Sequence, residues 1–252
     1  MVESHSIQAA ERLVVILDRP AHPGNIGAVA RAMGNTGFSR LRLVAPRQFP
    51  HPDADNYAVG CTAILEQTAI YADLTAALAD CHLVVATTNR ARGQRQVVLT
   101  PDQLGERVRT FLTRPEVQVG ILFGTERTGL LSADVERAGL ICHIPTRGEQ
   151  GSLNLSQAVL LVLYALMQAL GKEEGMAHDP FRDDPPATAE AMEHLFVHME
   201  ETLTAIGFLK PGQKRHMMGS IKAIFHRAGL DRREVSILRG ILHEVISCRD
   251  RP

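Results

Sequence analysis

The stretch 144-IPTRGEQGSLNLSQAVLLVLYALMQAL-170 decides the fold class, because a strand end, a polar glycine-containing loop and a long apolar helix follow one another. The strand ends near Ile144, and the helix is expected over Asn154–Leu170. This helix is apolar around most of its circumference, so it has to be buried in the core or against another subunit. Ser152 or Asn154 can serve as its N-cap. The stretch therefore predicts a loop-to-helix junction at the edge of a sheet.

Before this stretch, short apolar runs alternate with helical stretches. The runs are rich in Val, Ile and Leu and are bounded by Gly, Pro or polar residues, which is typical of strands buried on both faces. The expected strands are Leu13–Leu17, Leu41–Val44, Leu83–Ala86, Gln118–Phe123 and Leu140–Ile144. The expected helices are Ile26–Asn35, Leu74–Ala79, Pro101–Phe111 and Ala133–Ala138. This alternation predicts an α/β domain, a parallel sheet with helices on both faces.

The composition changes after Leu170. Residues 171–188 are acidic and proline-containing, which is typical of a linker between a first domain, 1–170, and a second module, 189–252. In the module we expect the helices Ala189–Ile206, Gln213–Ala228 and Arg232–Ile246. We expect Thr188 to cap the first of them, and Asp231 with Glu234 to form a capping box at the last.

The charge balance alone argues against a nucleic-acid partner. The 252 residues carry a net charge of −1, whereas binding to a phosphate backbone relies on Lys and Arg. The charges are segregated, however. Residues 172–201 hold two Lys/Arg and nine Asp/Glu, and residues 207–239 hold eight Lys/Arg and two Asp/Glu. Such segregation can give a basic face to a nearly neutral protein, although solvated helix faces explain it equally well.

Other general features favour a cytoplasmic protein. No apolar run is long enough to span a membrane, and the first residues lack the pattern of a signal peptide. The four cysteines, Cys61, Cys81, Cys142 and Cys248, form no CxxC pair and have no His pair at zinc-site spacing. We therefore expect reduced thiols and no metal.

The loop PGNIGAVAR, residues 23–31, follows the first expected strand. A glycine-rich turn of this kind can bring backbone N–H groups to an anion, or its glycine can be purely structural. The loop matches neither GxGxxG nor GxxxxGK[ST], so neither a dinucleotide site nor a P-loop is indicated. Asn25 and Arg31 face different sides of an ideal helix. They converge only if Asn25 lies in the turn that precedes the helix.

A second loop, LFGTERTGL at residues 122–130, follows another apolar strand. Its two glycines bracket Glu126 and Arg127. This arrangement suits a loop that wraps a ligand, and it also suits an ordinary surface loop with an exposed ion pair.

Together these loops resemble a known family. The motifs NIGxxAR, FGxExxGL and IPxxxxxxSLNLxxA, in this order and spacing, resemble the signature motifs of the SPOUT-class RNA 2′-O-ribose methyltransferases. The tail segments LFVHMEETLTAIGFL and ILRGILHEV resemble the C-terminal module of the bacterial TrmJ-type tRNA (cytidine/uridine-2′-O)-methyltransferases. The resemblance covers nearly the whole chain, and it is weakest in the linker. It implies an α/β sheet with a C-terminal trefoil knot, an exception to the rule against threaded chains, plus a small helical module.

The resemblance also implies a reaction. Members transfer a methyl group from S-adenosylmethionine to a tRNA ribose, and in the TrmJ type the target is cytidine or uridine at nucleotide 32 of the anticodon loop. This chain has Gly151 where a second serine can occur in the family. The residues expected at the cofactor are Thr87, Thr88, Asn89, Gly124, Glu126, Ile144, Gly151, Ser152, Leu153 and Asn154.

By the same resemblance, the catalytic residues are Arg31, Asn25 and Ser152, and no metal is required. A guanidinium group stays protonated at ordinary pH, so Arg31 suits charge stabilisation and phosphate binding better than proton abstraction. Family members are homodimers in which Arg31 of one subunit meets the cofactor loops of the other. The residues expected to contact RNA are Arg31, Arg90, Arg92, Lys214 and Arg215.

Three alternatives remain open. The substrate can be ribosomal RNA or another tRNA position, or the chain can be a non-catalytic RNA-binding protein that keeps the knot. A Rossmann-type NAD enzyme has the same strand–helix alternation, but the absence of GxGxxG counts against it.

Overall fold

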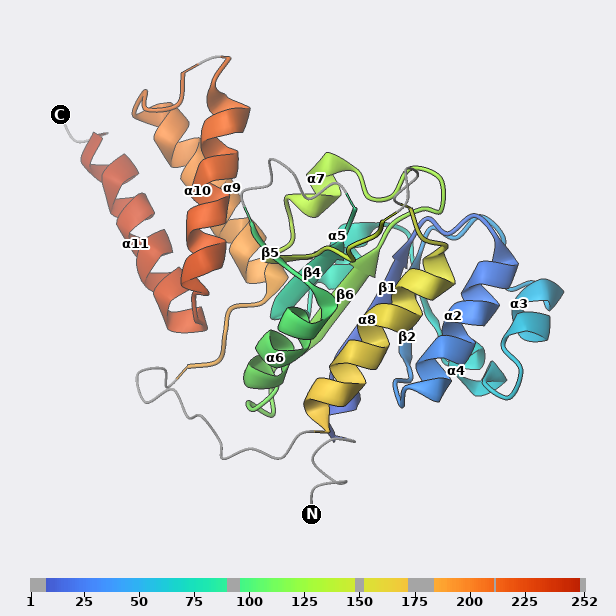
Figure 1. The fold of residues 1–252 in the computed structure, drawn as a ribbon. Coiled ribbons are helices and arrows are strands. Elements are labelled where there is room, and N and C mark those ends of the chain that lie inside the picture. Colours follow the sequence, from blue (N-terminus) through green and yellow to red (C-terminus); the bar gives the residue numbers. More distant parts are fainter. Residues whose placement is uncertain (1–7, 90–95, 148–151, 172–183, 211, 250–252) are drawn as a thin grey trace.

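The computed structural model describes residues 8–89, 96–147, 152–171, 184–210 and 212–249 (Figure 1). Its centre is a seven-stranded sheet in which every described strand pair is parallel. The order across the sheet is β3-β2-β1-β6-β4-β7-β5, so β6 and β7 lie between strands that precede them in the chain. The strands are β1 Leu13–Asp18, β2 Arg40–Val44, β3 Ala69–Tyr71, β4 Leu83–Thr87, β5 Val97–Leu99, β6 Val119–Phe123 and β7 Leu140–Cys142.

Helices cover both faces of the sheet, which confirms the predicted fold class. Successive side chains of β1 point to opposite faces, so Val15 belongs to one core cluster and Val14 to the other. The first face is covered by α2, α6 and α8, which lie side by side in Figure 1, and the other by α5 and α7. The helices of this domain are α2 Pro23–Asn35, α3 Pro52–Tyr57, α4 Thr62–Glu66, α5 Leu74–Leu78, α6 Pro101–Phe111, α7 Ser132–Val135 and α8 Leu155–Leu170.

Several predicted boundaries were wrong. The last strand ends at Cys142 rather than at Ile144, and the predicted helix Ala133–Ala138 is the short α7. Strands β3 and β5 and helices α3 and α4 were not predicted, because segments of three to six residues carry too little periodicity. The trefoil knot stays a prediction from the resemblance.

The C-terminal module consists of α9 Ala189–Ala205, α10 Lys214–Ala228 and α11 Arg232–Arg249. The predicted N-cap of α9 is confirmed, because the Thr188 hydroxyl accepts a hydrogen bond from the Ala191 N–H. The capping box of α11 is confirmed as well: the N–H groups of Asp231 and Glu234 each donate to the other's carboxylate. The module has its own apolar core, made by Ala187, Met192, Leu195, Phe196, Met199 and Val235.

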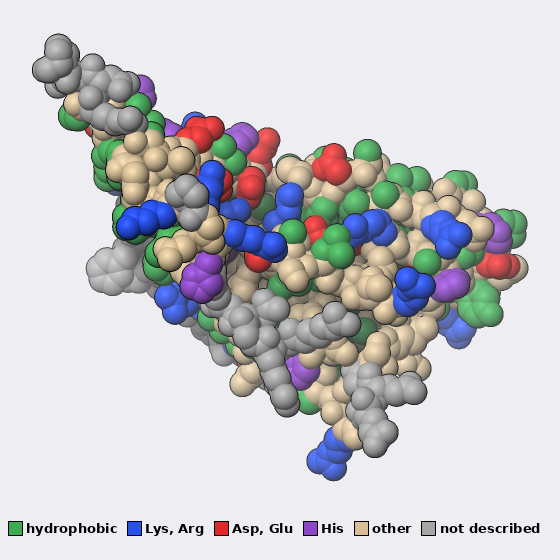
Figure 2. All heavy atoms as spheres, turned by 90° about the horizontal axis from the view of Figure 1, so that it is seen from above, with side chains coloured by type: hydrophobic (Ala, Val, Ile, Leu, Met, Phe, Trp, Pro, Cys, Tyr) green, Lys and Arg blue, Asp and Glu red, His purple; other side chains and the backbone are tan. Residues whose placement is uncertain are grey.

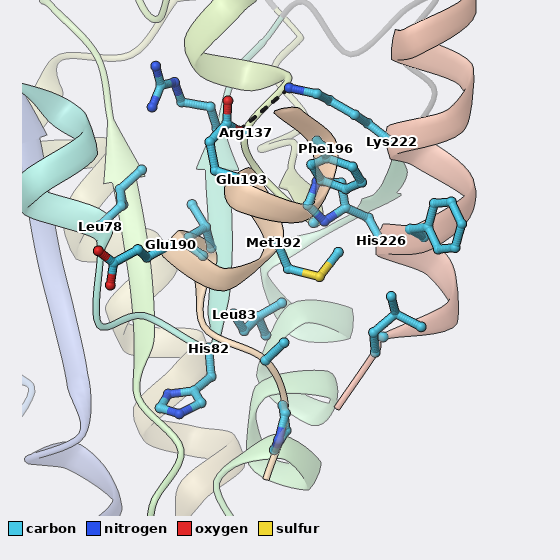
Figure 3. A pocket seen from close by; sticks show the side chains of 18 of the residues that line it. Leu78, His82, Leu83, Arg137, Glu190, Met192, Glu193, Phe196, Lys222 and His226 are labelled. Atoms are coloured by element: carbon cyan, nitrogen blue, oxygen red, sulfur yellow. Dashed lines mark ion pairs between the residues drawn. The ribbon is translucent and has the colours of Figure 1, made fainter. Parts of the chain in front are cut away.

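The module packs against the edge of the first domain through a few contacts. The Ala189 N–H donates to the Cys81 carbonyl over 2.7 Å, and Arg114 donates to the Asp184 carbonyl over 2.9 Å. Residues 184–188 of the expected linker therefore lie in the junction. A cavity of about 80 Å³ lies there. Figure 3 shows His82 and His226 among the residues that line it. Burial lowers the pKa of His226 to about 4.

Candidate functional site

A second cavity, of about 340 Å³, lies at the carboxyl ends of β4, β6 and β7, on the face that Figure 2 shows. This volume falls within the range of small-molecule sites, about 300–1,000 Å³. In parallel α/β sheets, ligands bind at the carboxyl ends of the strands. Its lining residues are Thr87, Thr88, Asn89, Phe123, Gly124, Thr125, Glu126, Arg127, Thr128, Gly129, Leu130, Cys142, Ile144, Thr146, Ser152, Leu153, Leu155 and Ala158.

Most of the residues expected at the cofactor lie together here. The cavity is lined by Thr87, Thr88, Asn89, Gly124, Glu126, Ile144, Ser152 and Leu153. Asn154 lies just outside the lining, and Gly151 lies outside the described residues. The lining combines apolar walls with hydroxyl, amide and carboxylate groups, a mixture that is typical of small-molecule sites.

The loop after β6 folds tightly on itself. The Gly129 N–H donates to the Thr125 carbonyl, and the Thr128 N–H donates to the Thr125 hydroxyl. A Cβ atom at Gly124 would lie 2.2 Å from the carbonyl carbon of Gly129, and Gly129 itself has a φ of +68°. Both glycines of this motif are therefore required by the shape of the cavity wall.

The loop after β4 is held by the two strands beside it. The Thr87 hydroxyl donates to the carbonyl of Leu122 over 2.9 Å, and the Thr88 N–H donates to the carbonyl of Cys142 over 3.0 Å. These bonds fix the floor of the cavity where the three strands end.

A chain of hydrogen bonds joins the three sequence motifs. The Glu126 carboxylate accepts from the Asn25 side-chain amide over 3.0 Å and from the N–H groups of Ala21 and His22. The Asn25 oxygen in turn accepts from the Asn154 side-chain amide over 3.1 Å. Both polar ends of the Asn25 amide are thus engaged, which makes Asn25 a residue that positions the loops.

Glu126 is the centre of this network. Burial raises the pKa of its carboxyl group, but the hydrogen bonds from Asn25, Ala21 and His22 outweigh burial and leave the pKa below its ordinary value. The negative charge also lies at the N-terminus of α2, where the helix dipole favours an anion. The network therefore holds a carboxylate and the start of α2 in one fixed geometry.

Arg31 does not share this geometry. Helix α2 begins at Pro23, so Asn25 lies on the helix rather than in the preceding turn, and the condition for convergence of Asn25 and Arg31 is not met within one chain. Arg31 is exposed and does not line the cavity.

Gly27 lies four residues before Arg31 on the same helix face, and a Cβ atom there would lie 2.0 Å from the Ala54 carbonyl oxygen. Gly27 is therefore a packing residue that allows α3 to contact α2.

Asn154 is the N-cap of the helix that follows it, the role that the sequence predicted for either Ser152 or Asn154. Its side-chain oxygen accepts from the N–H and the hydroxyl of Ser156, which makes it the N-cap of α8. The Asn154 side chain thus caps α8 with its oxygen, while its amide nitrogen donates to Asn25 in the network.

Ser152 is exposed at the rim of the cavity.

The residues expected to contact RNA are spread more widely. Lys214 and Arg215 lie at the start of α10, where they form ion pairs with Glu200 (2.8 Å) and Glu136 (3.7 Å). Arg90 and Arg92 lie outside the described residues. Figure 2 shows Lys and Arg side chains scattered over the cavity face rather than gathered in one patch.

Neither a metal-binding group of side chains nor a membrane-spanning helix is found in the part of the chain that the structure describes. Within the ranges that the structure describes, no three His, Cys, Asp or Glu side chains form a group that could hold a metal ion. None of the described helices combines the length and apolarity needed to cross a membrane.

Known proteins match this chain in both of its parts. Residues 12–164 match the model of the SpoU rRNA Methylase family, which spans the sheet and all three motif loops. The chain belongs to the SpoU methylase family. Residues 190–251 match the C-terminal domain of tRNA methyltransferase TrmJ, so the resemblance found in the tail is confirmed.

The relatives of this SpoU methylase match it over most of its length. The tRNA (cytidine/uridine/adenosine-2'-O-)-methyltransferase TrmJ of Pseudomonas aeruginosa is 38% identical over 93% of each chain. The tRNA (cytidine/uridine-2'-O-)-methyltransferase TrmJ of Pectobacterium atrosepticum is 31% identical over 95% of this chain and 99% of its own. The crystal structure of TrmJ from Z. mobilis superimposes with a TM-score of 0.78 at 37% identity, covering 92% of this chain and 98% of the other.

Some site features could not be found in the sequence. The backbone donors of Ala21 and His22 come from positions without a motif, about a hundred residues before Glu126. Cys142 and Leu155 line the cavity, yet they read as ordinary core residues. No sequence signal distinguishes Cys142 and Leu155 from other core residues, because only the folded sheet and α8 bring them to the cavity.

Proposed function

We propose that this SpoU methylase is an S-adenosylmethionine-dependent tRNA 2′-O-ribose methyltransferase that modifies cytidine or uridine at nucleotide 32 of the anticodon loop. The observation that carries the proposal is the convergence of three motif loops on one cavity, in a chain whose tail matches the TrmJ C-terminal domain. The tRNA 2′-O-methyltransferase names of the relatives support the substrate class.

The cavity fits the cofactor. Its volume and its mixed lining suit an adenosine with an amino-acid tail, and the Gly124 loop forms a wall that a larger residue would disrupt. The loop at Thr87, Thr88 and Asn89 and the stretch from Ile144 to Leu153 would hold the adenine and ribose. When bound, the cofactor supplies an electrophilic methyl group whose leaving group departs without charge.

The protein then has two tasks at the ribose. It aligns the 2′-oxygen with the methyl group, and it stabilises the charge that develops as the hydroxyl proton leaves. The Arg31 guanidinium suits the second task, and it can also hold the adjacent phosphate through paired hydrogen bonds. Ser152, at the rim of the cavity, is placed to position the hydroxyl, while Asn25 fixes the loops through Glu126 and Asn154.

The placement of Arg31 supports a homodimer with a composite site. Within one chain Arg31 is exposed and does not line the cavity, which supports a site that draws Arg31 from a second copy. Helix α8 offers a surface for that copy, because Leu160, Leu161 and Tyr164 are 41%, 46% and 53% exposed. Mixing an inactive Arg31→Ala protein with a variant defective in the cofactor cavity should restore part of the activity. No restored activity in mixed dimers would contradict a shared site.

The C-terminal module is proposed to contribute tRNA contacts through α10. Lys214 is 46% exposed and Arg215 81% exposed, so phosphate groups can compete for them with their carboxylate partners. Replacing both with Gln should weaken tRNA binding and reduce its salt dependence. An unchanged salt slope would show that α10 does not contact the phosphate backbone.

Methyl transfer from labelled S-adenosylmethionine tests the proposal. Purified tRNA should become labelled and ribosomal RNA should not, and nuclease digestion should release 2′-O-methylcytidine or 2′-O-methyluridine. Labelled ribosomal RNA would favour the alternative substrate. RNA binding without methyl transfer, under conditions in which cofactor binding is measured, would favour a non-catalytic RNA-binding protein.

A further inference from the structure

An exposed tyrosine lies beside the first motif. Tyr57, one of three tyrosines in the chain, is the last residue of α3, and its side chain is 59% exposed. A Cβ atom at Gly24 would lie 3.2 Å from both Cδ2 and Cε2 of the Tyr57 ring. The ring is therefore packed against the bare backbone of Gly24 on one side, while more than half of the residue's surface is exposed. Such a ring is held in place without being buried.

The ring lies on the side of α2 that carries Arg31, the residue that the proposed homodimer brings to the cavity of a second copy, so it would reach the composite site together with Arg31. Arg31 lies seven residues after Gly24, almost two helical turns, so it shares the helix face that carries the ring. At 1.5 Å per residue the two positions are about 10 Å apart along the axis. An RNA strand that reaches Arg31 therefore passes near Tyr57.

Cationic groups stand on the same side of the molecule. The Arg47 N–H donates to the Pro20 carbonyl over 3.1 Å, which places the exposed Arg47 beside the loop that leads into α2. His22, the N-cap residue of α2, is exposed as well. Arg31 and Arg47 provide the positive groups that a phosphate backbone needs around an aromatic ring, and the His22 ring adds a polar group beside them.

Carboxylates are also present and restrict where the phosphates can run. Asp53 and Asp55 are exposed on α3, and the Asp53 carboxylate lies 3.6 Å from the His51 ring. A phosphate is repelled from this side of α3 and is favoured near α2. The arrangement suits a single strand whose backbone follows α2 while one base turns towards α3.

We propose that Tyr57 is a stacking platform for a nucleobase of the RNA loop that carries the target nucleotide, and that it thereby helps to position the ribose. This inference rests on the proposed function. Single-stranded loops are recognised largely by bases that stack on aromatic side chains, and every base has a face that can do so. Tyr57 therefore contributes affinity and geometry rather than base identity.

Three substitutions separate stacking from packing. Tyr57→Phe keeps the ring, Tyr57→Leu keeps apolar contact with Gly24 but removes the aromatic face, and Val59→Ala removes a neighbouring side chain that is 60% exposed. We expect Tyr57→Leu to raise the KM for tRNA by about 5- to 150-fold, the factor for one base stacked on an aromatic ring. The KM for the cofactor and the melting temperature should change little. Tyr57→Phe and Val59→Ala should resemble the wild type.

A fluorescent anticodon stem-loop provides a readout that does not depend on activity. The probe is an RNA carrying 2-aminopurine at one loop position at a time. One position should show a fluorescence change on binding that Tyr57→Phe keeps and Tyr57→Leu loses. If Tyr57→Leu retains both the wild-type KM and the fluorescence change, the stacking role is wrong, although the proposed methyltransferase function is unaffected. If the wild type methylates no tRNA, the proposed function itself fails.

Discussion

Removing the charge of Glu126 should uncouple the three motif loops. The Glu126→Gln side chain keeps its size, but one of its terminal atoms becomes an NH₂ group. Whichever way that amide points, it faces N–H donors: Ala21 N at 3.0 Å on one side, and His22 N at 3.1 Å with Asn25 Nδ2 at 3.0 Å on the other. At least one acceptor is lost and the remaining bonds lose their charge.

The size of the effect follows from these three bonds. A hydrogen bond to a charged group contributes roughly 1 kcal/mol more than a neutral one, and the partial exposure of Glu126 reduces the sum. We expect a loss of about 2 kcal/mol in the free energy of unfolding, which lowers the melting temperature by about 4–8 °C in a chain of this size. Cofactor binding should weaken as well, because Glu126 lines the cavity.

Thermal unfolding and calorimetric titration with S-adenosylmethionine measure the two effects. Glu66→Gln, the same chemical change on the exposed surface of α4, is the matched control and should leave both unchanged. Because the folded-state pKa of Glu126 lies below its ordinary value, its stabilisation is complete above the ordinary value and is lost as the pH falls through the lowered one. The difference between wild type and Glu126→Gln should therefore shrink in acid. Equal melting temperatures at neutral pH would refute the role of the network.

Three other predictions follow from the same structure. Arg31→Ala should abolish methyl transfer while cofactor affinity stays within a few-fold by calorimetry, and Arg31→Lys should also be poor; loss of cofactor binding with an intact fold would contradict this role. Gly27→Ala should cost about 1–3 kcal/mol in thermal unfolding, because the new Cβ would meet the Ala54 carbonyl oxygen at 2.0 Å, and an unchanged melting temperature would contradict that contact. Asp80→Asn should cost about 1 kcal/mol at neutral pH, since the half-exposed Asp80 pairs with buried Arg42 at 2.6 Å. Hydrogen bonds from Arg42 lower the pKa of Asp80 from 3.8 to about 2, so urea unfolding should show the difference disappearing as the pH falls from about 4 to 2.

The sequence predicted the parts of the fold that carry long periodic signals. The apolar runs at β1, β2, β4, β6 and β7 were recognised because their side chains are buried on both faces. Strands β3 and β5 have three residues each, with exposed side chains, so nothing in their composition marks them as strands. Their pairing depends on neighbours that only the folded sheet supplies.

The start of α2, beside the site, likewise could not be predicted from local sequence alone. Local rules predicted the helix from Ile26, whereas it begins at Pro23 with His22 as a cap residue that makes no side-chain capping bond. The N–H groups of Ala21 and His22, which lead into the helix, donate to Glu126, a residue from another motif. Most of the residues that the resemblance assigned to the cofactor line one cavity, but the contacts that make Asn25 a positioning residue are not local.

Replacing a single hydroxyl group tests the central claim most directly. Two tRNA substrates would be compared, one unmodified and one with a single 2′-deoxyribose at nucleotide 32, each incubated with the protein and labelled S-adenosylmethionine. Methyl transfer to the ribose of nucleotide 32 predicts full labelling of the first and none of the second, with equal binding of both. Equal labelling of the two tRNAs would contradict the proposed target.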